Sequence, residues 1–156
     1  LDVQMLTVHC CGGSAMLKGA LNGATEAAKQ TGNEAPLILG VTVLTSMDES
    51  DLNEVSVNKT PEGQVIHLAQ MATGAGLKGL VCSPKEIALL REVLPPEVQL
   101  VTPGIRPMGS EAGDQKRVMS PAEAVQAGAD WLVIGRPIYA ADNPREAAEA
   151  ILDSLG

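Results

Sequence analysis

Five short apolar runs recur along the chain, and each is followed by a stretch that has helical spacing or a helix-start signal. The runs cover residues 5–9, 37–44, 79–82, 99–102 and 131–134. They are continuous rather than alternating with polar residues, which is typical of parallel strands buried on both faces. The pattern therefore predicts an α/β fold in which helices connect successive parallel strands.

Helix starts are marked by short local motifs. Residues 83–86 (SPKE) and 120–123 (SPAE) each place Ser as the cap, Pro at the first helical position and Glu at the third. Residues 60–63 (TPEG) open another helix, and Pro144 suits the first turn of a last helix that reaches about residue 155. Ser14 is the expected cap of the first helix, which should run to about residue 30.

The chain of 156 residues has room for one domain, spanning residues 1–156. Two architectures fit five strand–helix units: an open doubly wound sheet, or part of a (β/α)₈ barrel. A whole barrel takes roughly 250 residues, so five units amount to about five-eighths of one. In an incomplete barrel the first and last strands have unpaired edges, and we expect association or aggregation there.

Composition narrows the function classes. With 45% apolar residues the chain can bury a core, so disorder is excluded. Its net charge of −8 argues against a general nucleic-acid binder and against docking on anionic lipid. The longest apolar run, residues 37–44, is far shorter than the roughly 18 residues that a membrane span needs. Three cysteines form neither a disulfide framework nor a zinc spacing, which favours a reducing cytosol.

Functional groups in both architectures lie beyond the carboxyl ends of the strands. The polar residues expected there are His9, Thr45, Ser46, Cys82, Thr102, Arg106 and Arg136. The strand running into Gly135-Arg136 predicts an anion site, because glycine lets a phosphate approach backbone N–H groups and arginine adds a forked contact. The alternative for Arg136 is a surface ion pair with a carboxylate.

Two further segments qualify as binding elements. The long stretch between Thr102 and Ser120 brings donors to the same end as Arg136, namely Arg106, Gln115, Lys116 and Arg117. Its alternative is a solvated excursion. The strand end at residues 42–46 (TVLTS) offers the hydroxyls of Thr42, Thr45 and Ser46 and its backbone to the polar edge of a flat ligand, or else caps the next helix.

Acid–base chemistry has weaker signals. His9 and the adjacent Cys10 and Cys11 are interpreted as structural residues, because a lone histidine and small thiols usually serve packing. No motif of metalloproteases, redox thiols, serine hydrolases or phosphate-binding loops occurs in the chain. The sequence thus contains binding residues without a nucleophile or acid–base set.

Several segments resemble bacterial orotidine 5′-phosphate decarboxylases. They are VHCCGG at 8–13, VTVLTSM at 41–47, LVCSPKE at 80–86, LVTPGIRPMGSEAGDQKRVMSPAEA at 100–124 and VIGRPIYAADNP at 133–144. The resemblance runs essentially from residue 1 to residue 156. It implies a (β/α)₈ TIM barrel, of which this chain covers roughly strands 4 to 8.

The resemblance also implies a function. The family converts orotidine 5′-monophosphate to UMP and CO₂ in pyrimidine synthesis, with no metal or organic cofactor, as cytoplasmic homodimers. Thr45 matches the family's contact at the pyrimidine end. Arg106 and Gln115 match contacts in the loop that grips the phosphate, and Gly135 and Arg136 match the phosphate site.

One part of the family pattern has no match. The catalytic Asp-x-Lys-x-x-Asp array occurs nowhere in the 156 residues, so no catalytic residue is assigned to this chain. We expect that array upstream of residue 1 and expect the chain by itself to be inactive. The alternatives are a non-catalytic phosphate- or nucleotide-binding half-barrel, and a sister barrel decarboxylase or synthase acting on a sugar phosphate.

Overall fold

Five strands form one parallel sheet in the computed structural model, which describes residues 3–107 and 118–156. The strands are β1 (Met5–His9), β2 (Leu37–Val41), β3 (Gly79–Val81), β4 (Gln99–Thr102) and β5 (Trp131–Leu132). They lie side by side in sequence order, and every neighbouring pair is parallel. All five predicted strands are confirmed, although β2, β3 and β5 end earlier than their apolar runs do.

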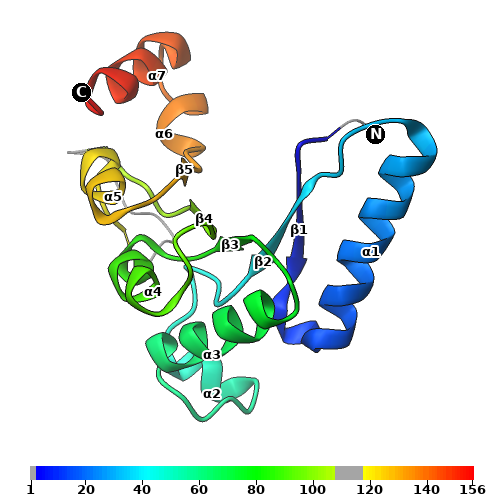
Figure 1. Ribbon diagram of the computed structural model, residues 1–156. Helices are drawn as coiled ribbons and strands as arrows, with labels where there is room; N and C mark the ends of the chain where they lie inside the picture. Colours follow the sequence, from blue (N-terminus) through cyan, green and yellow to red (C-terminus); the bar gives the residue numbers. More distant parts are fainter. Residues whose placement is uncertain (1–2, 108–117) are drawn as a thin grey trace.

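The helices follow the strands around the outside of the sheet. They are α1 (Gly13–Thr31), α2 (Glu49–Glu54), α3 (Pro61–Gly74), α4 (Ile87–Val93), α5 (Pro121–Ala127), α6 (Arg136–Tyr139) and α7 (Pro144–Asp153), with 3₁₀ turns η1 (Cys10–Gly12) and η2 (Pro84–Glu86). Figure 1 shows α1, α3, α4 and α5 in an arc outside the strands. A doubly wound sheet reverses its strand order at a switch point, and this sheet does not. The structure is therefore of the barrel type.

Capping residues set most helix starts. The Glu86 carboxylate accepts a hydrogen bond from the Ser83 amide at 2.8 Å, and Glu123 accepts from the Ser120 amide at 3.0 Å, as the motifs predict. The Ser14 prediction is wrong. Turn η1 runs directly into α1, whose cap position is Gly12 and has no side-chain cap.

Helix α2 was missed by the sequence pattern. Its cap is Asp48, whose carboxylate accepts hydrogen bonds from the amides of Ser50 and Asp51. The Asp51 carboxylate in turn accepts from the Asp48 amide at 2.8 Å. Only Leu52 of this helix is buried, so the segment lacks the apolar periodicity by which a helix is recognised.

The core lies between the sheet and the helices. Leu80 and Leu100 of the central strands are fully buried and belong to one core cluster with Ile87 and Leu90 of α4. The two outer strands differ from the prediction that all strands are buried on both faces: Leu6 of β1 is 47% exposed and Trp131 of β5 is 50% exposed. Each outer strand has one neighbour among the described residues, so half of its backbone edge and part of its side chains stay open.

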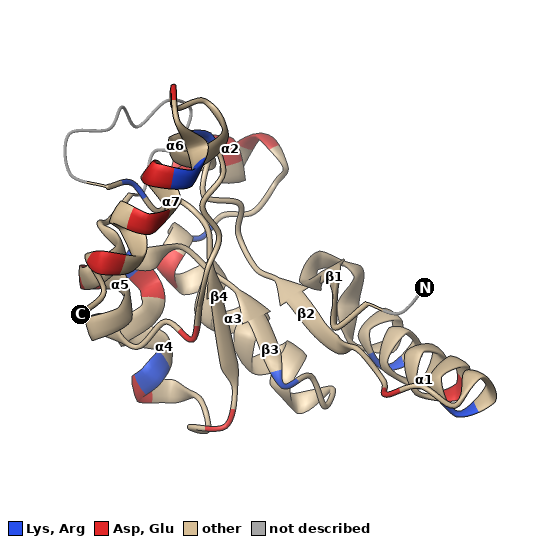
Figure 2. Cartoon of the chain, turned by 90° about the horizontal axis from the view of Figure 1, so that it is seen from above, with Lys and Arg blue, Asp and Glu red and all other residues tan. Residues whose placement is uncertain are grey.

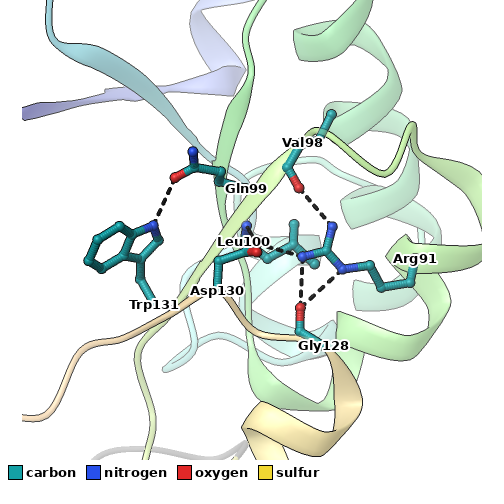
Figure 3. A network of polar contacts seen from close by, with 7 residues as sticks. All are labelled: Arg91, Val98, Gln99, Leu100, Gly128, Asp130 and Trp131. Carbon is teal, nitrogen blue, oxygen red and sulfur yellow. Dashed lines mark hydrogen bonds and ion pairs between the residues drawn. The ribbon is translucent and has the colours of Figure 1, made fainter.

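An arginine network fixes the start of the last strand (Figure 3). Arg91 of α4 donates from Nε and Nη2 to the Gly128 carbonyl at 3.0 and 2.7 Å, and from Nη1 to the Val98 carbonyl at 2.7 Å. Its Nη2 also contacts Asp130, whose carboxylate accepts from the Leu100 amide at 2.6 Å. One guanidinium thereby ties together α4, the end of α5 and the approach to β5.

Candidate active-site face

The carboxyl ends of all five strands meet at one edge of the sheet, because every pair is parallel. Figure 2 shows α2, which follows β2, and α6, which follows β5, at the same end of the molecule. The segments that carry Thr45, Arg106, Gly135 and Arg136 all leave strands at this edge. This is the face on which barrel enzymes build their active sites.

A pocket of about 180 Å³ opens at the ends of β2 and β3. One wall is residues 41 and 43–46, and the other is Val81, Cys82 and Pro103. Thr45 lines this pocket and is buried, with 8% of its surface exposed. Helix capping is not the role of Thr45 or Ser46, because Asp48 caps α2.

Thr42 follows β2 directly and lies in sequence between the lining residues Val41 and Val43. Its amide and its hydroxyl both donate to the Val81 carbonyl, at 3.2 and 2.8 Å. Thr42 is 7% exposed, so these bonds are shielded from water. The sequence motif at residues 42–46 predicts one polar strand end and does not separate Thr42 from the other hydroxyls. A threonine directly after a buried strand was the available signal.

The segment after β4 is pinned where it leaves the sheet. Ile105 and Met119 form a parallel bridge, and the Arg106 amide donates to the Met119 carbonyl at 2.9 Å. The Arg106 side chain is half-buried, and its Nη1 donates to the Ile105 carbonyl at 2.8 Å. Gln115, predicted to act with Arg106, lies outside the described residues, as do Lys116 and Arg117.

Gly135 and Arg136 form the turn after β5. Gly135 precedes α6, and its carbonyl accepts hydrogen bonds from the amides of Ile138 and Tyr139, at 2.8 and 3.1 Å. A Cβ at Gly135 would lie 3.4 Å from the Tyr139 ring, which is an ordinary van der Waals contact, so the turn has room for a small side chain. Gly135 and Arg136 are both exposed to solvent at the strand-end face.

The thiol of Cys10, directly after β1, is a buried titratable group at this face. Burial raises the pKa of the Cys10 thiol to about 11, with the neighbouring Cys11 as a smaller cause. Cys10 is fully buried after β1, so it stays protonated and does not act as a nucleophile near neutral pH. Within residues 3–107 and 118–156, no group of three His, Cys, Asp or Glu side chains is placed to hold a metal ion.

A larger pocket of about 500 Å³ lies beside α5, α6 and α7, and the sequence did not predict it. Its lining is mostly small or apolar: Pro107, Ser120, Pro121, Ala122, Pro137, Ala147, Ala150, Ile151 and Ser154. The lining holds no ionisable side chain, so this pocket offers a surface for packing rather than groups for chemistry.

Comparisons with known proteins place the chain in a family context. A sequence model of the "Orotidine 5'-phosphate decarboxylase / HUMPS family" matches residues 1–151. Orotidine 5′-phosphate decarboxylase of Actinobacillus succinogenes is 50% identical over 155 residues, and that of Opitutus terrae is 53% identical over 155 residues. Each alignment covers 99% of this chain and 65% of the relative.

Solved structures agree with the sequence comparison. The crystal structure of orotidine 5′-phosphate decarboxylase from Lactobacillus acidophilus superposes with a TM-score of 0.83 at 36% identity, covering 99% of this chain and 64% of that one. The chain thus spans about 65% of the length of the curated relatives it matches.

No helix among the described residues is long and apolar enough to cross a membrane.

Proposed function

Because the chain belongs to the orotidine 5′-phosphate decarboxylase / HUMPS family, we propose that it is the nucleotide-binding portion of an enzyme that decarboxylates orotidine 5′-monophosphate to UMP. The observation that carries the proposal is about 50% identity to decarboxylases over 99% of the chain. The part of the family that carries the Asp-x-Lys-x-x-Asp array has no counterpart in these 156 residues. Catalysis would therefore need residues from outside them.

In this proposal the strand-end face binds the two ends of the nucleotide. Thr45, in its pocket between β2 and β3, contacts the pyrimidine. Gly135, Arg136 and Arg106 bind the phosphate together with Gln115. A glycine turn followed by arginine suits a phosphate, because backbone N–H groups and a forked guanidinium can surround its oxygens.

The phosphate contacts matter for rate as well as for affinity. Binding energy from a remote, non-reacting group lowers the barrier when it is realised in the transition state. In the complete enzyme, a lysine of the missing array would protonate C6 of the pyrimidine as CO₂ leaves. The residues of this chain would hold the nucleotide in place for that step, with no metal or organic cofactor. We further propose that the complete protein is a cytosolic homodimer.

Titration of the 156-residue chain with UMP tests the proposal. Arg136→Ala removes one charge-assisted contact and should weaken binding by about 10- to 100-fold. Arg145→Ala is the matched control, because Arg145 lies on α7 and pairs at 2.8 Å with Glu149. The control should bind UMP like the unmodified chain. Absence of UMP binding at millimolar concentration, or equal affinity in Arg136→Ala, would refute retained nucleotide recognition.

Activity is tested separately. The chain alone should not turn over orotidine 5′-monophosphate, and turnover above background would contradict the assignment of catalysis to residues outside it. A second candidate, a non-catalytic nucleotide-binding half-barrel, is favoured by the missing array. The two candidates separate when the chain is joined to an N-terminal portion of a relative, because only the first predicts that decarboxylation then appears.

A further inference from the structure

The Thr42 hydroxyl forms a hydrogen bond that connects the two walls of the pocket lined by Thr45. Thr42 belongs to the segment that forms one wall, and the carbonyl that it contacts belongs to Val81 in the other wall. The Thr42 amide and the Thr42 hydroxyl both donate to this oxygen, at 3.2 and 2.8 Å. A carbonyl has two lone pairs, so it accepts both.

Thr45 lies between two fixed points. Upstream are the Thr42 bonds, and downstream is Asp48, which caps α2. The Met47 amide donates to the Leu44 carbonyl at 2.9 Å, so Thr45 and Ser46 are the central residues of a tight turn. The Thr42 bonds tie the start of this turn to β3, whereas the Asp48 cap is made within the same segment.

We propose that Thr42 is a positioning residue that holds Thr45 at the pocket and thereby sets the preference for a pyrimidine nucleotide over its sugar phosphate alone. The inference rests on the proposed function, in which Thr45 contacts the pyrimidine. Thr42 itself does not touch the ligand. It acts by fixing the separation of the β2 and β3 strand ends.

The first experiment measures the turn without any ligand. Hydrogen exchange of the amides of residues 44–48 is compared in the full chain and in Thr42→Val, which keeps the branched shape and loses the hydroxyl. Loss of one neutral hydrogen bond should speed this exchange by about five-fold. Thr42→Ser keeps the hydroxyl and should exchange as the unmodified chain does. Unchanged exchange in Thr42→Val would overturn the proposal.

The second experiment compares UMP with ribose 5-phosphate as ligands. Thr42→Val should lower the affinity ratio of UMP to ribose 5-phosphate by roughly five-fold, since it loosens only the pyrimidine contact. Thr42→Ser should restore the ratio. A purely structural role would weaken both ligands together and leave the ratio constant, which overturns the proposal. A lowered ratio of UMP affinity to ribose 5-phosphate affinity in Thr42→Ser would also overturn the proposal.

A matched control uses the same chemical change elsewhere. Thr25 of α1 donates its hydroxyl to the Leu21 carbonyl at 2.8 Å, so Thr25→Val also removes one threonine–carbonyl bond. It should leave both the exchange of residues 44–48 and the ligand ratio unchanged. If Thr42→Val does not fold, Thr42→Ser decides. An unchanged ratio of UMP affinity to ribose 5-phosphate affinity supports the proposal, and a lowered ratio overturns it. If the unmodified chain binds neither ligand, the proposed function fails, and hydrogen exchange alone decides the role of Thr42.

Discussion

Replacement of Arg91 by methionine tests whether one guanidinium anchors the last strand. Methionine keeps an unbranched apolar stem and removes all the donors. Arg91 donates three hydrogen bonds to the carbonyls of Gly128 and Val98 and also pairs with Asp130. All of these partners lie at the amino-terminal ends of β4 and β5, opposite the face that carries Gly135 and Arg136. The change therefore affects stability without altering the proposed binding residues.

The magnitude follows from the contacts. Each hydrogen bond from the partly exposed guanidinium to a carbonyl contributes about 1 kcal/mol. The ion pair with Asp130 adds less than about 1 kcal/mol, because its side chains are 24% and 41% exposed. Arg91→Met should thus lower the free energy of unfolding by about 3–4 kcal/mol. Arg91→Lys should lose about 2 kcal/mol, because one ammonium cannot reach both carbonyls with the same fork geometry.

Urea unfolding followed by circular dichroism measures these free energies. Asp130→Asn is the control, since the amide oxygen can still accept from the Leu100 amide while the ion pair is lost. It should lose less than about 1 kcal/mol. A loss below about 1 kcal/mol in Arg91→Met, or equal stability of Arg91→Lys and the unmodified chain, would refute the anchoring argument.

Three further outcomes are expected. Gly40→Ala should destabilise the chain by about 1–3 kcal/mol in the same urea assay, because the new Cβ would lie 2.7 Å from the Cys10 sulfur. Adding Cys10→Ala should restore part of this loss, and a double variant whose loss equals the sum of the two single losses would contradict the argument. Hydrogen bonds from the side chain and backbone of Ser120 lower the pKa of Glu123 from its ordinary value of 4.5. The ionised carboxylate therefore stabilises the fold at pH values above 4.5, and this contribution is lost as the pH falls through the lowered pKa. Ser120→Ala should return the pKa toward 4.5 in an NMR titration, and an unmoved pKa would exclude this cause. A thiol reagent at pH 8 should label exposed Cys11 and spare buried Cys10, whose pKa is about 11; mass spectrometry of the native chain checks this, and equal labelling would contradict it.

The candidate site was partly accessible from the sequence. Thr45, Arg106, Gly135 and Arg136 follow apolar runs, so their placement beyond strand ends was predictable once the runs were identified as parallel strands. The pocket around Thr45 was not predictable, because Pro103 joins its lining from a segment more than fifty residues away. Whether Thr45, Arg106, Gln115, Gly135 and Arg136 bind a nucleotide stays a prediction.

Local signals in the sequence were sufficient to predict the strands and most helix starts. A buried strand is marked by its own apolar run, and a capping box by a serine and a glutamate three residues apart, as at 83–86 and 120–123. These interactions close within four residues, so residue type alone specifies them. Helix α2 escaped detection because its carboxylate cap leads into a segment with a single buried side chain.

The long-range polar contacts depend on how the elements pack in three dimensions. Thr42 donates a hydrogen bond to a carbonyl 39 residues away in the sequence, and Arg91 donates to one 37 residues away. Every residue has a backbone carbonyl, so no residue type marks the one that a distant side chain will reach. Strand register and helix packing select that carbonyl, and through it they fix both the pocket at the end of β2 and the start of β5.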